Sequence, residues 1–151
     1  MSLRVYKLKF SKSSYQLSDD YDRLSDIEKE KISNMEADSF FDMDDDGQYT
    51  FYIIVRPIEL KAYLSVLNEN LIQYNISDIS DDILKGELDL ELDIKNINPL
   101  NSLKYSFFMD DLDDWVYDNL DIDIVLDRIS SIGINSLRKI EKEFLNNNYN
   151  V

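Results

Sequence analysis

The sequence predicts an α+β protein, with three or four strands in a mainly antiparallel sheet, helices over one face and a C-terminal helical hairpin. Apolar residues alternate over residues 3–10, 48–56 and 87–95 and recur at helical spacing in most of the remaining segments. Only three Gly and two Pro interrupt the 151 residues, and 44% of the chain is hydrophobic. This apolar content is enough for one hydrophobic core, so a single domain is expected over residues 1–146. Residues 147–151 are expected to form a frayed tail.

The predicted strands differ in which faces are apolar. Both faces of residues 48–56 are apolar, which indicates a central strand. Residues 87–95 alternate between Leu or Ile and charged side chains, which predicts a half-buried strand with an acidic solvent face. Residues 72–79 fit either a short strand or a loop, and residues 11–22 are polar and typical of turns.

Helix-start signals divide the first half of the chain. Ser25, followed three residues later by Glu28, has the form of a capping box and predicts a helix over residues 26–40. Pro57 suits the first turn of the next helix. Residues 80–85 predict a single helical turn that the following glycine closes.

The C-terminal half predicts three further helices. The first carries an apolar stripe and is either continuous or broken near Asp110. The stripe consists of Leu103, Phe107, Phe108, Leu112, Trp115, Val116 and Leu120. Residues 121–131 and 136–146 then form the predicted hairpin, and Gly133 stands where a helix end favours a left-handed residue.

The hairpin also carries a family resemblance, in residues 123–129 (DIVLDRI), 133–137 (GINSL) and 141–145 (EKEFL). About 25 of the 151 residues resemble a helical-hairpin tail of Bacteroidetes proteins, which follows rhomboid-type domains in some chains and ends unrelated proteins in others. The resemblance implies a lineage, and no protease activity comes with it. The family's Thr is replaced by Arg138, so Ser136 or Asn135 is expected to cap the last helix.

Charge restricts the partners. Thirty-one Asp and Glu against 16 Lys and Arg give a net charge of −15. Nucleic acid and anionic membrane surfaces are disfavoured because both are bound through Lys and Arg. Basic protein surfaces or cations are favoured. With no Cys and no apolar run of about 20 residues, a cytoplasmic protein without membrane insertion is expected.

The residue inventory argues against an enzyme. Without His and Cys the chain lacks the side chains for a Ser-His-Asp triad, a Cys-His pair or an imidazole acid-base catalyst. No glycine-rich phosphate loop is present. Asp81 or Asp82 with Asp93 and Lys95 resembles a nuclease Mg²⁺ arrangement, but the wet face of a strand explains the same residues. Carboxylate-based activity remains open.

One motif matches a cation-binding loop. Asp42, Asp44 and Asp46 followed by Gly47 occupy the first, third, fifth and sixth positions of a calcium loop. The twelfth position is Ile53 instead of the usual Glu. A Ca²⁺- or Mg²⁺-binding module is therefore the alternative function, and a solvated acidic turn leading into a strand is the simpler interpretation.

The most unusual segment joins aromatic residues to dense carboxylates, with no Lys or Arg between Lys104 and Arg128. Its expected partner-binding residues are Asp110, Asp111, Asp113, Asp114, Trp115, Tyr117 and Asp118. Aromatic side chains supply contact energy and carboxylates supply steering. The leading prediction is a non-catalytic adaptor, inhibitor or accessory subunit that binds a basic protein surface. The competing interpretation is that the apolar members are core and the aspartates a solvated face.

Overall fold

A four-stranded antiparallel sheet organises the molecule. The computed structural model describes residues 2–36, 39–43, 47–94 and 96–149. The strand order is β2-β3-β1-β4, and each neighbouring pair is antiparallel. The strands are β1 (Arg4–Ser13), β2 (Ser39–Met43), β3 (Gln48–Val55) and β4 (Tyr74–Asp78). The interior place of β3 confirms the central strand predicted from its two apolar faces.

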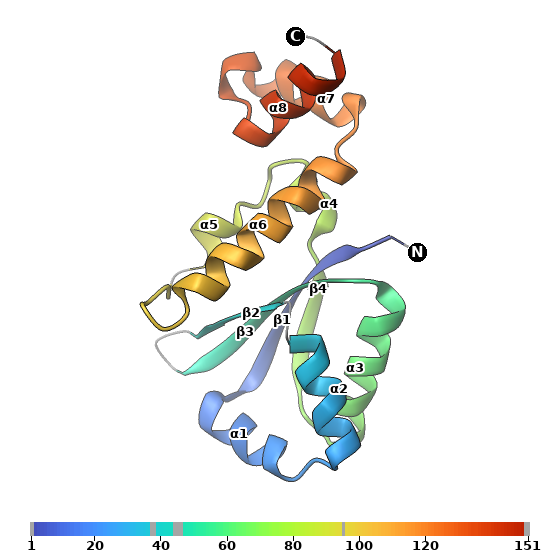
Figure 1. Ribbon diagram of the computed structural model, residues 1–151, viewed down its shortest axis with the longest axis vertical. Coiled ribbons are helices and arrows are strands. Elements are labelled where there is room, and N and C mark those ends of the chain that lie inside the picture. Colours follow the sequence, from blue (N-terminus) through green and yellow to red (C-terminus); the bar gives the residue numbers. More distant parts are fainter. Residues whose placement is uncertain (1, 37–38, 44–46, 95, 150–151) are drawn as a thin grey trace.

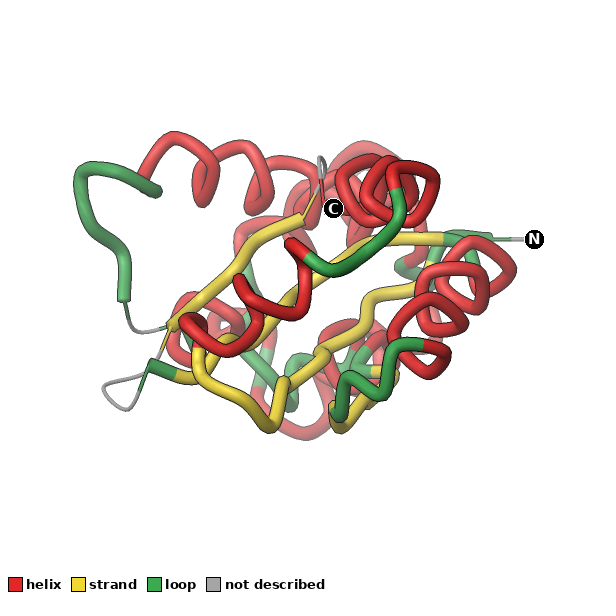
Figure 2. The backbone as a smooth tube through the Cα atoms, turned by 90° about the horizontal axis from the view of Figure 1, so that it is seen from below, coloured by secondary structure: helices red, strands yellow, loops and turns green. Residues whose placement is uncertain are grey.

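Helices make up most of the remaining structure, as Figures 1 and 2 show. They are α1 (Ser14–Asp22), α2 (Asp26–Glu36), α3 (Pro57–Glu69), α4 (Ser80–Leu84), α5 (Leu90–Asp93), α6 (Ser102–Asn119), α7 (Ile122–Ile132) and α8 (Lys139–Tyr149), with a 3₁₀ turn, η1 (Ile134–Ser136), between α7 and α8. The predicted α+β class and C-terminal helical hairpin are confirmed.

The sheet separates two apolar clusters, so the prediction of helices on one face is wrong. Phe40 and Tyr52 belong to a cluster with the side chains of α4 to α8. Their neighbours Phe41 and Phe51 belong to the other cluster, which α2 and α3 cover. Figure 1 shows α2 and α3 on one side of the sheet and α6 on the other. The physical reason is that successive side chains of β2 and β3 point to opposite faces, and both sets are apolar.

The strand predicted for residues 87–95 is the largest error. Over residues 87–94 the chain forms a loop and then α5. Leu90 and Ile94, four residues apart, are buried, whereas Leu92 between them is 76% exposed. The buried spacing is therefore that of a helix. The Asp89 carboxylate accepts a hydrogen bond from the backbone N–H of Glu91 (2.9 Å). This N-terminal cap stabilises a helix, rather than a strand, from Leu90 onward.

Two elements were missed in the first half. The helix predicted over residues 26–40 ends at Glu36, and β2 follows. Residues 11–22, expected to form turns, instead extend β1 and then form α1. Elsewhere the local signals hold. Ser25 and Glu28 make both hydrogen bonds of the capping box (3.0 and 3.2 Å). Helix α6 is continuous through Asp110, which settles the alternative that the sequence left open.

The C-terminal hairpin is joined to the rest of the protein by a buried ion-pair cluster. The Glu141 carboxylate is fully buried and accepts hydrogen bonds from Arg128 Nε (2.6 Å) and Arg138 Nε (2.8 Å). It also accepts the backbone N–H of Arg138 (3.0 Å). Helix α8 therefore begins after Arg138, and the expected cap at Asn135 or Ser136 is wrong. Glu141 replaces the missing side-chain cap. At its other end α8 continues to Tyr149.

The same two arginines reach the C-terminal end of α4. Arg138 donates to the backbone oxygens of Ile83 (2.6 Å) and Leu84 (2.8 Å), and Arg128 donates to that of Lys85 (2.7 Å). These carbonyls form the negative end of the α4 dipole, where cations are favoured. The arginines thus connect α4 to α8 through one carboxylate. This connection holds the hairpin beside α6, the helix that carries the predicted interaction segment (Figure 1).

Candidate interaction surface on helix α6

Helix α6 lies across the sheet with one apolar side facing the core. The buried residues of this side are Phe108, Leu112, Trp115 and Val116. Trp115 is 5% exposed, and its indole N–H donates to the backbone oxygen of Leu3 (2.9 Å). A buried indole with its N–H satisfied is a structural residue. Trp115 was predicted to contact a partner, but its side chain lies in the core.

Tyr117 also differs from its predicted place at an open edge. It is half-buried, and its ring lies edge-on to that of Phe144 in α8, with 6.0 Å between the centroids. Its hydroxyl accepts a hydrogen bond from the Asn147 side chain (3.2 Å). Tyr117 therefore joins α6 to the hairpin.

The five aspartates of the predicted site are all exposed, namely Asp110, Asp111, Asp113, Asp114 and Asp118. Four of them, Asp110, Asp113, Asp114 and Asp118, form no ion pair with a Lys or Arg of the described ranges. The negative charge of these four carboxylates is therefore available for steering a positive partner.

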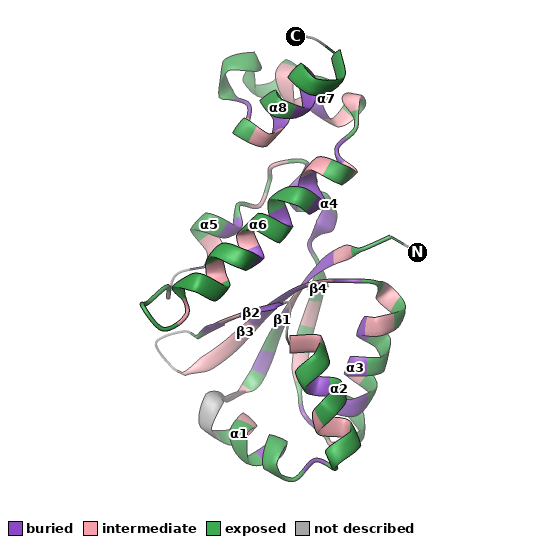
Figure 3. Cartoon of the chain, viewed as in Figure 1, coloured by how far each residue is buried: buried purple, intermediate pink, exposed green. Residues whose placement is uncertain are grey.

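Two apolar residues continue this acidic face, although both were predicted to lie on the buried stripe. Phe107 is 60% exposed and Leu103 is 66% exposed. At about 100° of rotation per residue, one side of α6 carries these two and then four carboxylates. The six are Leu103, Phe107, Asp110, Asp111, Asp114 and Asp118. The burial colours of Figure 3 show exposed segments along the outer side of α6. The sequence contained a signal for this, because adjacent residues of a helix are about 100° apart, so Phe107 and Phe108 could not both face the core.

Carboxylates from neighbouring elements extend the acidic region inward. A cleft of about 840 Å³ lies between α6, the segment before and into α5, and the hairpin. Glu91, Asp113 and Glu143 line it. Burial raises the pKa of Asp113, and nearby negative charges, Asp110 first among them, raise it further. Arg128 and Arg138 also line this cleft, but their guanidinium groups are bound to Glu141 and to α4.

The predicted cation loop is only partly described. Asp44 and Asp46 lie outside the described residues. Asp42 is in β2, is buried, and accepts a hydrogen bond from the backbone N–H of Asn96 (3.2 Å). Among the residues that the structure describes, no group of three or more Asp and Glu is arranged to hold a metal ion. The loop therefore stays a prediction from the sequence.

Asp93, considered above with the nuclease arrangement, has a structural place. Its Oδ2 accepts hydrogen bonds from the Tyr52 hydroxyl (2.6 Å) and from Lys7 Nζ (2.8 Å). Both partners lie on the sheet face beneath α5, so Asp93 attaches this short helix to the sheet. Asp81 belongs to an exposed pair with Arg4 (3.6 Å), and Lys95 lies outside the described residues.

Comparison with known proteins gives no indication of function, so the functional argument rests on the structure. No protein-family model, curated protein or solved structure matches the chain. In the described part of the chain, none of the helices combines the length and the apolar character required to cross a bilayer. The fold and the surface together define an acidic α+β protein with an exposed apolar and acidic helix face.

Proposed function

We propose that the chain is a non-catalytic protein-interaction module, an adaptor, inhibitor or accessory subunit, whose outer α6 face binds a basic protein surface. The observation that carries this proposal is the continuity of Phe107 and Leu103 with Asp110, Asp111 and Asp114 on one side of one helix. Large apolar side chains exposed beside charge are characteristic of interfaces, where the apolar part gives contact energy.

The carboxylates give the choice of partner. A lysine- or arginine-rich surface would be drawn to α6 by the charge of Asp110, Asp113, Asp114 and Asp118 and by the net charge of −15. The cleft beside α6 offers further carboxylates, so a protruding Lys or Arg of the partner would find Glu91 and Asp113, whereas Glu143 there is paired with Lys139 of the same helix (3.9 Å). The proposal includes a cytoplasmic location, which the absence of Cys supports.

The test compares two double charge reversals of equal size. Asp110→Lys with Asp114→Lys changes the proposed face at positions four apart on α6. Asp123→Lys with Asp127→Lys makes the same change at exposed positions four apart on α7. Each variant and the unmodified chain are immobilised and used for affinity capture from native lysate at about 0.1 M and about 1 M salt, where the Debye lengths are about 10 and about 3 Å.

The expected result is a protein retained at low salt by the unmodified chain and by the α7 variant, and lost with the α6 variant. Binding of the purified partner should then weaken about tenfold or more with Phe107→Ser, because this substitution removes the larger of the two exposed apolar side chains of the face. Retention that is indifferent to salt, or equal losses with both reversals, would overturn the proposal.

A further inference from the structure

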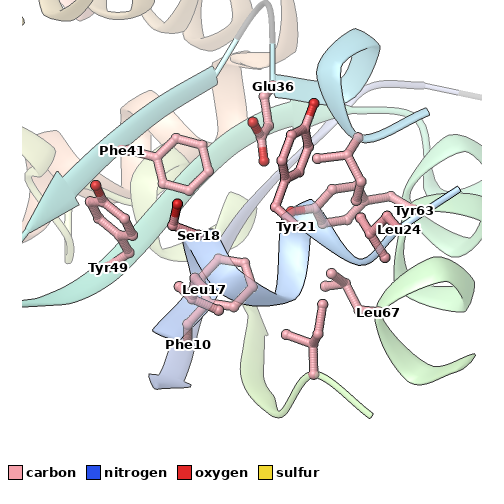
Figure 4. Close-up of a pocket in the computed structure, with 12 residues that line it drawn as sticks. Phe10, Leu17, Ser18, Tyr21, Leu24, Glu36, Phe41, Tyr49, Tyr63 and Leu67 are labelled. Atoms are coloured by element: carbon pink, nitrogen blue, oxygen red, sulfur yellow. The ribbon is translucent and has the colours of Figure 1, made fainter. Parts of the chain in front are cut away.

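A pocket of about 430 Å³ lies on the opposite face of the sheet, between the strands and helices α1 to α3 (Figure 4). Its size falls in the range of about 300–1,000 Å³ typical of small-molecule sites. Most of its wall is apolar or aromatic; the polar groups are the hydroxyls of Ser18 and of three tyrosines and the single carboxyl group of Glu36. The lining residues are Phe10, Leu17, Ser18, Tyr21, Leu24, Ile32, Glu36, Phe41, Tyr49, Tyr63, Leu67 and Ile72.

The rings of this wall hold one another in place. Phe41 stacks on Phe51 of the neighbouring strand, with 4.5 Å between centroids, and Tyr49 meets Phe41 edge-on at 5.4 Å. Phe51 in turn contacts Tyr63 of α3 at 5.6 Å. Because these rings are fixed by the sheet and by α3, the aromatic surface exists before any ligand arrives, which lowers the entropic penalty of binding.

The one carboxyl group belongs to Glu36, the last residue of α2. Figure 4 shows it pointing into the pocket, toward the rings of Phe41 and Tyr21. Burial raises the pKa of Glu36 to about 7, although the positive charge of Lys104 acts against this rise. Within the described ranges, no hydrogen bond to the carboxyl oxygens offsets the burial. Among the described residues the carboxyl group has no ion-pair partner, because the nearby Lys104 ammonium donates to the backbone oxygen of Glu36 instead (3.3 Å). Buried carboxylates are normally paired or hydrogen-bonded.

We infer that this pocket binds a small organic cation, an ammonium group carried on an apolar or aromatic body. The ammonium would lie against the aromatic faces and beside the Glu36 carboxylate, which would supply the missing countercharge. One ring of the wall, that of Tyr21, already has a cation over it, because the ammonium of Lys29 lies 5.6 Å from its centroid. The apolar body of the ligand would fill the volume between the leucines and isoleucines.

Charge decides among the ligand classes. An anion would meet Glu36 and a protein of net charge −15. A neutral apolar molecule would fill the volume but would leave Glu36 protonated and unpaired. A cation would displace the proton of Glu36 into solvent and replace it with an ion pair, so the charge in the pocket is balanced. The site shares no residue with the α6 face and goes beyond the proposed function.

The test uses three probes with the same phenyl body: benzyltrimethylammonium, neutral 2-phenylethanol and anionic 3-phenylpropanoate. Calorimetry near pH 7, repeated in buffers with different ionisation enthalpies, measures affinity and proton exchange together. The cation is expected to bind about tenfold or more tightly than the neutral probe and to release protons. The Glu36→Gln variant is expected to lose that preference and the proton release.

Glu30→Gln is the matched control, because Glu30 is exposed on the same helix and lies outside the pocket. Tyr49→Leu, which keeps an apolar wall but removes one ring, should weaken the cation more than the neutral probe. Equal affinity for cation and neutral probe, an unchanged affinity in Glu36→Gln, or no binding of any probe at millimolar concentration would each overturn the inference.

Discussion

Two glutamates on opposite sides of the sheet, one fully buried and one half-buried, have carboxyl groups in contrasting surroundings. Glu141 is fully buried and held by Arg128 and Arg138, whose hydrogen bonds outweigh the effect of burial and lower the pKa of its carboxyl group. Glu36 is half-buried without such partners, and burial raises its pKa to about 7. The first carboxylate is bound by the protein itself, whereas the second is available for a ligand.

The comparison predicts the largest effect at Glu141. Glu141→Gln removes the negative charge while two arginines remain directed at it, and it should reduce the free energy of unfolding by about 3–5 kcal/mol. Urea unfolding at pH 7, followed by circular dichroism, measures the change. Glu143→Gln on the same helix is the control, since its pair with Lys139 is exposed and 3.9 Å long, and it should change stability little. Similar effects of the two substitutions would mean that the cluster contributes little.

Glu36 should behave in the opposite way, with the sign set by its raised pKa. The folded protein keeps the proton up to about pH 7, whereas the unfolded chain releases it near the ordinary value of 4.5. Folding therefore binds protons between these values, and this contribution to stability falls as pH rises from about 5 to 8. Glu36→Gln removes the fall and should stabilise the protein at pH 8, relative to the unmodified chain, by up to about 3 kcal/mol.

Urea unfolding at pH 5 and pH 8 tests this, with the Glu30→Gln substitution for comparison. The difference between Glu36→Gln and the unmodified chain should be small at pH 5 and large at pH 8. If Glu36→Gln is more stable than the unmodified chain and yet loses its preference for the cation probe, the lost preference cannot be explained by unfolding. A difference that does not depend on pH would contradict the raised pKa.

The sequence predicted elements whose signals are local. The capping box at Ser25 and Glu28, the central strand β3 and the helix beginning at Pro57 each follow from a few adjacent residues. Residues 87–95 misled because two of the alternating apolar positions, Leu90 and Ile94, are also four residues apart, and these two are the buried ones. Tertiary contact with the sheet, through Asp93, favours the helix there.

The candidate sites show a sharper division. The acidic side of α6 was readable from the run of aspartates, but the choice of Phe107 over Trp115 as the exposed aromatic depends on which side of the helix meets the sheet. The pocket around Glu36 could not be read at all. Its wall combines residues of α1, α2, α3 and three strands, and nothing near Glu36 in the sequence distinguishes it from the other acidic residues.

The smallest predicted effect concerns the junction that holds Arg128 in place. Gly86 has a positive φ of 73°, and a Cβ there would lie 2.2 Å from an Arg128 guanidinium nitrogen. Gly86→Ala should therefore displace Arg128 from the Lys85 carbonyl and weaken its contact with Glu141, in addition to the backbone strain. Gly47→Ala carries the same strain, with φ of 78°, but its Cβ meets no atom within 4 Å. Gly86→Ala should destabilise the fold by about 1–2 kcal/mol more than Gly47→Ala, measured by urea unfolding. If the two glycines give equal losses, the close approach of Arg128 to the backbone contributes nothing to the attachment of the hairpin.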